Sequence, residues 1–202
     1  MQRPIQVVKI TLGEVMLEGG LALKKGEPVV IFAHGSGSSR HSPRNQFVAR
    51  ALNEAGIGTL LFDLLTREED MDCERRFDIE LLTGRLEEVT KWFKRRPEGL
   101  KTKIGYFGAS TGAAAALKAA AELSKDIGAV VSRGGRPDMA EDALGSVQAP
   151  TLLIVGGLDD VVIKLNKKAY GMMKGVKELK IVYGRNRTLR SQARLAVSPH
   201  LI

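Results

Sequence analysis

The residue of this chain best placed to do chemistry is a serine between two glycines. Gly108-Ala109-Ser110-Thr111-Gly112 follows an apolar run, residues 103–107, and precedes an alanine-rich stretch, residues 113–121. A GxSxG sequence at a turn from a strand to a helix is typical of a nucleophile elbow, where the hydroxyl stands exposed above the sheet edge. The pattern predicts Ser110 as a nucleophile. The alternative is a glycine-rich turn whose serine caps the following helix.

A serine nucleophile needs a base to take its proton and an acid to orient that base. Asp159 and Asp160 come directly after the apolar run of residues 151–155, which predicts a strand. They would therefore lie at the carboxyl end of a strand, the edge where open α/β sheets build their sites. We expect Asp159 to be the acid and keep Asp160 as the second choice. The alternative is that both acids cap a helix that begins near Val162.

The base is the missing part of this constellation. The chain has three histidines, His34, His41 and His200. Nucleophile-elbow enzymes usually follow the chain order serine, acid, histidine, and only His200 follows Asp159. His34 is expected to be structural beside the glycine-rich loop that follows it. The residues expected to line the pocket are His34, Arg40, His41 and Arg133. His200 completes the order only if the C-terminal segment folds back to Ser110.

A second glycine-rich segment could stabilise the charge that develops during acyl transfer. Residues 34–39, His-Gly-Ser-Gly-Ser-Ser, follow a predicted strand at residues 28–33. Backbone amides in such a loop, together with the amide after the nucleophile, form an oxyanion hole, and removing one donor costs about 2.7–4 kcal/mol. We expect Ser36, Gly37 and Thr111 to supply these amides. A phosphate-binding P-loop is disfavoured because its lysine and its GKS/T ending are absent.

Short apolar runs alternate with longer amphipathic ones, which predicts a mainly parallel sheet with helices on both faces, a three-layer α/β fold. The first two predicted strands are expected to form an antiparallel pair at one edge. Strands are predicted at residues 5–12, 15–23, 28–33, 58–62, 103–107, 127–131, 151–155 and 179–183, and helices at residues 43–55, 78–93, 113–121 and 162–173. The pattern is lost after residue 183. We therefore expect a domain over residues 1–183 and an atypical basic tail over residues 184–202.

Composition is that of one ordinary globular domain: 202 residues, 44% hydrophobic and 27% charged. No apolar run approaches the roughly 20 residues of a membrane span, and no secretory signal pattern opens the chain, so a cytoplasmic location is expected. The single cysteine, Cys73, cannot form an internal disulfide. Half of the net charge of +8 comes from four arginines in residues 185–202, which hold no acid. Because this charge is concentrated in the tail, we expect no nucleic-acid partner. We expect no membrane partner either, because no apolar run is long enough to span a membrane. The sequence leaves the oligomeric state open.

Together these residues resemble the α/β-hydrolase superfamily, and within it the dienelactone-hydrolase-like group, which includes hydrolase domains joined to phosphoribosyltransferase-like domains. The matching blocks are residues 32–45, 60–66, 78–82, 108–112, 132–138 and 149–159. The resemblance implies an α/β-hydrolase fold and a hydrolase for a small ester or lactone, with Ser110 as the nucleophile and Asp159 as the acid. It implies no metal and no organic cofactor.

The chain departs from this group at its C-terminus. Such proteins usually place the catalytic histidine in a Gly-x-x-His-Leu-like stretch soon after the last strand, whereas Gly184 is followed by Arg-Asn-Arg-Thr-Leu. Residues 187–193 can be encoded CGC ACC TTG AGG AGC CAG GC, and reading one base earlier gives CAC CTT GAG GAG CCA GGC, His-Leu-Glu-Glu-Pro-Gly. We hypothesise that the tail is out of frame. If the histidine is truly absent, the alternative function is a catalytically silent hydrolase-fold protein that binds a ligand or a partner.

Four cationic groups predict the chemistry of the ligand. Arg40, His41, Arg133 and Arg136 all lie in or beside the segments expected to form the site, which favours an anionic or carboxylate-bearing small molecule. A further alternative is a nucleotide or phosphate held by residues 36–39 and Arg40.

Overall fold

The computed structural model describes residues 3–183, which form one eight-stranded sheet with the strand order β1-β2-β4-β3-β5-β6-β7-β8. The strands are β1 (Gln6–Leu12), β2 (Val15–Ala22), β3 (Val29–Ala33), β4 (Gly58–Phe62), β5 (Ile104–Ala109), β6 (Ile127–Arg133), β7 (Thr151–Gly156) and β8 (Lys177–Val182). β1 pairs antiparallel with β2, and β2 with β4, whereas every pairing from β4 to β8 is parallel. The predicted antiparallel pair at one edge is confirmed.

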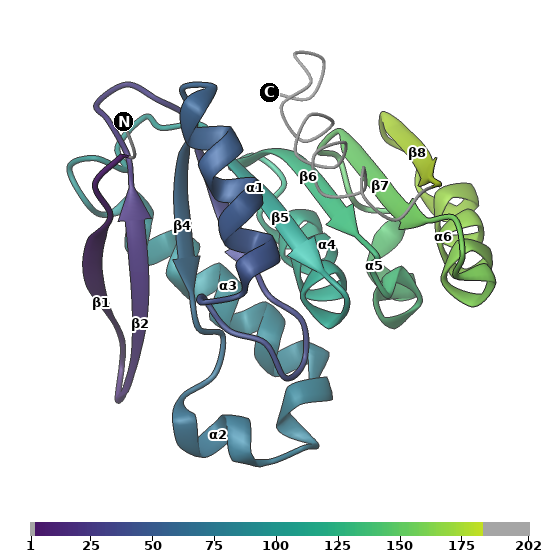
Figure 1. Cartoon of the computed structure of the whole chain (residues 1–202), viewed down its shortest axis with the longest axis horizontal. Coiled ribbons are helices and arrows are strands. Elements are labelled where there is room, and N and C mark those ends of the chain that lie inside the picture. The colour runs from purple at the N-terminus through teal and green to yellow at the C-terminus, as the bar shows by residue number, and fades with distance from the viewer. Residues whose placement is uncertain (1–2, 184–202) are drawn as a thin grey trace.

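Helices cover both faces of this sheet (Figure 1). They are α1 (Pro43–Glu54), α2 (Arg67–Met71), α3 (Ile79–Lys94), α4 (Thr111–Glu122), α5 (Glu141–Leu144) and α6 (Asp160–Met172), with 3₁₀ turns η1 (Arg75–Phe77) and η2 (Pro137–Ala140). α1 lies against one face, and α3 and α4 lie against the other. The chain therefore has the predicted three-layer α/β architecture with a mainly parallel sheet.

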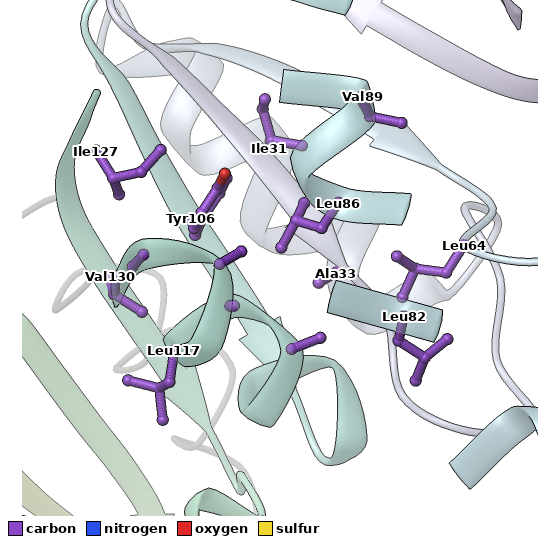
Figure 2. Close-up of a cluster of buried hydrophobic side chains, with 14 of the residues drawn as sticks. Ile31, Ala33, Leu64, Leu82, Leu86, Val89, Tyr106, Leu117, Ile127 and Val130 are labelled. Atoms are coloured by element: carbon purple, nitrogen blue, oxygen red, sulfur yellow. The ribbon is translucent and has the colours of Figure 1, made fainter. Parts of the chain in front are cut away.

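Two apolar clusters hold the layers together, one on each face. The larger cluster includes Ile31, Tyr106 and Leu117 and packs the sheet against α3 and α4 (Figure 2). The smaller one includes Phe32 and Phe107 on the face that α1 covers. Successive residues of β3 and β5 thus enter opposite clusters. Burial on both faces explains why these strands are apolar throughout, as is usual for parallel strands.

The shortest helices were not predicted. α2 and α5 have five and four residues, too few for a helical period to show in the sequence. α2 buries none of its residues and begins at a capping box formed by Thr66 and Glu69. Cys73 follows α2 and is exposed. Within residues 3–183, no helix has both the length and the apolar character that a membrane crossing requires. The predicted tail, residues 184–202, lies outside the described residues.

Candidate active site

Ser110 occupies a sharp turn between β5 and α4. Its backbone has φ 52° and ψ −122°, a conformation that costs energy for a residue with a side chain. The serine is exposed, and its side chain makes no capping hydrogen bond to α4. The alternative of a helix-capping serine therefore does not describe this turn. An exposed, strained serine above the carboxyl end of a parallel strand is the geometry of a nucleophile elbow.

Glycines allow the chain to pack tightly around this turn. A Cβ atom on Gly108 would lie 2.4 Å from Ala113 Cα, and one on Gly112 would lie 2.3 Å from the carbonyl oxygens of Ala33 and His34. A Cβ atom on Gly35 would lie 2.9 Å from Ser110 Cβ. The loop that follows β3 is therefore pressed directly against the nucleophile turn.

The predicted oxyanion loop contacts the first turn of α4 through a hydrogen bond. The Ser36 amide donates to Thr111 Oγ1 at 3.0 Å. Thr111 is buried, whereas Gly37 is exposed and has φ +65°. The structure brings the Ser36 and Thr111 segments together, as an oxyanion hole requires. The Ser36 amide already has an acceptor, however, so a developing oxyanion would have to displace the threonine hydroxyl.

Asp159 immediately precedes α6, and its Oδ1 accepts a hydrogen bond from the Val162 amide at 3.0 Å. It is exposed, and Asp160 is the first residue of the helix. Asp159 thus caps α6, which is the alternative interpretation of this acid. Its strand, β7, is separated from β5 by β6 alone, which places the two strands about 10 Å apart. A carboxylate that caps a helix through one oxygen can still orient a base through the other.

His34 is built into the structure through both ring nitrogens. The side chain is 7% exposed, its Nε2 accepts from the Leu64 amide at 3.0 Å, and its Nδ1 lies 3.0 Å from the Gly35 carbonyl oxygen. These partners require the neutral ring with its proton on Nδ1. Burial lowers the pKa of His34, and this outweighs the opposing effect of the Gly35 carbonyl. Because both ring nitrogens are engaged, neither is left to accept a proton from Ser110. This arrangement agrees with the structural role expected for His34.

Replacing His34 with Phe should destabilise the fold by about 1–3 kcal/mol near neutral pH, because the buried Leu64 amide loses its acceptor. The folded-state pKa of His34 lies below its ordinary value of 6.5, so the unfolded chain takes up the proton first as the pH falls. The stabilisation by His34 is thus complete above that value and is lost as the pH drops towards the folded-state pKa. Urea unfolding of both chains at about pH 7.5 and about pH 5.5 should show the difference shrink in acid. An unchanged difference would contradict the assignment.

His41 is exposed and lines a cavity of about 230 Å³ together with His34 and Arg40. The cavity lies between the loop after β3 and the segment that leads into α2, which adds Asp63 and Arg67 to its wall. The predicted pocket residues His34, Arg40 and His41 are thus brought together, and Arg133 does not line this cavity. His200 lies outside the described residues. Within residues 3–183, no three His, Cys, Asp or Glu side chains gather as metal ligands would.

Two of the four predicted cationic groups, Arg40 and Arg136, form ion pairs with acidic side chains. Arg40 pairs with Asp63 and, at 2.5 Å, with Glu18. Arg136 pairs with Asp138 at 2.7 Å. Both arginines thus already have acidic partners, and the expectation that they bind an anionic ligand stays a prediction. Asp63, which directly follows β4, was not among the predicted site residues. Its position directly after a predicted strand is the feature of the sequence that could have indicated it.

Comparison with known proteins identifies a family and several proteins that are similar to this chain. The dienelactone hydrolase family matches residues 17–182. Sequences from two strains of Mycobacterium tuberculosis, which carry the provisional name of a phosphoribosyl transferase, are 54% identical over 178 residues. These residues make up 88% of this chain and 40% of each relative, so the chain spans less than half of their length.

Many solved structures are similar over nearly the whole chain, including the two that follow. The crystal structure of a dienelactone hydrolase from Anabaena variabilis has a TM-score of 0.93 and 48% identity, with 98% of this chain and 96% of that chain covered. Est1E from Butyrivibrio proteoclasticus has a TM-score of 0.81 with 16% identity, covering 96% of this chain and 97% of its own. The two likenesses confirm the predicted α/β-hydrolase fold, and the second shows the fold alone.

Proposed function

Because the chain belongs to the dienelactone hydrolase family, we propose that it cleaves a small ester or lactone through an acyl-enzyme on Ser110. The observation that carries this proposal is the nucleophile turn itself. Ser110 combines a strained backbone, an exposed position and a hydroxyl that makes no capping bond. Gly35 holds the predicted oxyanion loop directly against it. No other described serine has a positive φ.

The reaction would proceed in two halves. Ser110 Oγ attacks the carbonyl carbon of the substrate while its proton passes to a base, and the tetrahedral oxyanion accepts hydrogen bonds from backbone amides. Thr111 supplies one amide, and Ser36 or Gly37 supplies the other. The alcohol then leaves with the proton, and water releases the acyl group by the reverse sequence. Asp159 would orient the base from the carboxyl end of β7.

A silent binding protein on the same fold is the second candidate, and the histidines favour it. His34 is committed through both nitrogens, and His41 precedes the nucleophile in the chain instead of following the acid. The family match ends at residue 182, and His200 is the one histidine after Asp159. The loss of one triad member, here the base, typically lowers kcat by about 10⁴- to 10⁶-fold.

Labelling with a fluorophosphonate distinguishes the two candidates. We expect a single adduct on Ser110, because an activated serine attacks phosphorus as it attacks an ester carbonyl. Intact mass and peptide mapping should show the adduct disappear in Ser110→Ala and persist in Ser39→Ala, a serine of the neighbouring loop. A folded protein that takes up no label would overturn the hydrolase proposal in favour of the silent one. An adduct on another serine would overturn the assignment of Ser110.

A further inference from the structure

A short segment after β6, residues 134–136, connects the nucleophile turn with helix α6; we call it the bridging segment. On one side, the Arg136 amide donates to the Ser110 carbonyl oxygen at 3.1 Å. On the other side, the Gly135 carbonyl oxygen accepts a hydrogen bond at 3.1 Å from the side chain of Asn166, a residue of α6. Two hydrogen bonds and three residues of backbone therefore link the nucleophile turn to this helix.

The bridging segment is fixed by its neighbours. A Cβ atom on Gly135 would clash with Ser132 Oγ and would lie 2.7 Å from Ala113 Cβ in α4. The Gly134 amide donates to the Ile154 carbonyl oxygen in β7 at 2.7 Å. The segment is thus held by β6, β7 and α4 together. A group bound to it has a fixed position relative to the nucleophile turn.

Asn166 is a polar residue in the buried stripe of α6. Its side chain is fully buried, and the other buried residues of the helix are Ile163 and Ala169. Its Nδ2 donates to the carbonyl oxygens of Gly135 and, at 2.9 Å, of Val162, whereas Oδ1 is buried without a partner among the described residues. Burying an amide whose acceptor is unmet costs free energy, so packing alone would favour an apolar residue here. The bond to Gly135 is what an apolar residue could not supply.

Asp159 and Asn166 lie on nearly the same side of α6. Seven residues separate them in the sequence, which is almost two helical turns and about 10 Å along the axis. Asp159 is tied to the helix by the bond that it accepts from the Val162 amide. The helix packs beside β7 and β8 (Figure 1). The position of the Asp159 carboxylate therefore follows the position of the helix, which Asn166 ties to the bridging segment.

We infer that Asn166 is a positioning residue, which fixes Asp159 relative to Ser110 through the bridging segment. The inference rests on the proposed function, in which Asp159 orients the base that serves Ser110. Asn166 acts only through the placement of Asp159. A misplacement of about 1 Å, caused at a distance from the reacting atoms, can lower a rate by about 10²-fold. The bond from Asn166 is therefore expected to matter to the reaction.

Crystal structures of the full chain and of Asn166→Ala, obtained in one crystal form, test the positioning without any turnover. The distance from Asp159 Cγ to Ser110 Oγ should change by about 1 Å or more, because α6 loses its bond to Gly135. Asn166→Leu removes the same bond and fills the space, so it serves if the alanine variant does not fold. An unchanged distance would overturn the inference.

Asn53→Ala is the matched control for these structures. Asn53 lies in α1, and its Nδ2 donates to the Ile57 carbonyl oxygen at 2.9 Å and to Thr59 Oγ1 at 3.1 Å. The control thus removes hydrogen bonds of the same kind from a helix on the other face of the sheet. It should leave the distance between Asp159 and Ser110 unchanged. A change as large as that in Asn166→Ala would reveal a general response to losing such bonds and would overturn the inference.

Ester hydrolysis shows whether the position of the acid matters to the reaction. Asn166→Ala should lower kcat for phenyl acetate by about 10²-fold and leave KM within about twofold. Asp159→Asn should lower kcat by about 10⁴-fold, since the base loses its orienting carboxylate. The double variant should be no slower than Asp159→Asn, because the placement of an absent acid has no effect. Losses that multiply would reveal a merely structural asparagine and overturn the inference.

The two measurements separate this inference from the proposed function. A distance that changes in Asn166→Ala, in a chain that hydrolyses no ester, supports the placement of Asp159 by Asn166 and overturns only the proposed function. An unchanged distance overturns the inference whatever the activity. A changed distance together with kcat equal to that of the unaltered chain also overturns it, because the acid would then tolerate the displacement.

Discussion

If the tail is out of frame, a chain in which residues 187–192 are replaced by the run His-Leu-Glu-Glu-Pro-Gly is expected to hydrolyse a small ester at least about 10³-fold faster than the unaltered chain. The replacement supplies a histidine after Asp159, in the order serine, acid, histidine that nucleophile-elbow enzymes follow. Loss of one triad member lowers kcat by about 10⁴- to 10⁶-fold, so its return should recover much of that factor. The measurement is kcat/KM for phenyl acetate with both chains. The prediction follows from the hypothesis that the tail is out of frame.

Three variants make this experiment decisive. The same replacement with Ala in place of the new histidine should show no gain, which separates the base from any other effect of the new run. Ser110→Ala in the histidine-containing chain should remove the gain, because nucleophile and base act as one unit. His200→Ala in the unaltered chain should leave its activity unchanged. A fast unaltered chain that is silenced by His200→Ala would instead assign the base to His200 and refute the hypothesis of a lost histidine.

The fold was predictable because burial on both faces leaves a clear pattern in the strands. β5 is apolar throughout since Tyr106 enters one cluster and Phe107 the other. The Gly58–Phe62 strand was predicted with its observed ends. α2 could not be found in the same way, because it is short and buries none of its residues. The contacts of α2 include the local cap at Thr66 and the ion pair between Glu69 and Arg85, which are 16 positions apart in the sequence.

The candidate site was predictable only where local sequence sets the geometry. Two glycines and a serine are enough to define the nucleophile turn, because the backbone there excludes a Cβ atom. The hydrogen-bond partners of the arginines are distant in the sequence: Asp63 is 23 positions from Arg40, and Asn45 is 88 positions from Arg133. Sequence alone therefore grouped four cations as one ligand site. The structure shows that Arg40 and Arg136 have acidic partners.

Gly112→Ala is expected to destabilise the fold by about 3 kcal/mol or more, at the upper end of overpacking effects. The new methyl group would lie 2.3 Å from the carbonyl oxygens of Ala33 and His34. Both are backbone atoms at the end of β3, so relief requires α4 to move away from the sheet. For a domain of this size the melting temperature should fall by roughly 10 °C. Differential scanning calorimetry measures this fall. At temperatures below its melting transition, where the variant is still folded, Ser110 should no longer be labelled by a fluorophosphonate.

Gly84→Ala is the matched control, since it makes the same chemical change at another helical glycine. Gly84 is exposed in α3, and a Cβ atom there would meet nothing within 4 Å. Alanine should therefore stabilise this helix by about 0.5–1 kcal/mol, through the lower flexibility of the unfolded chain and the better helix propensity. A loss of stability in Gly112→Ala together with a gain in Gly84→Ala would show that the close approach of β3 to α4 is what requires a glycine at position 112. It would exclude a general intolerance of alanine in these helices. A Gly112→Ala chain with unchanged melting temperature and full labelling would contradict the tight contact between the nucleophile turn and β3.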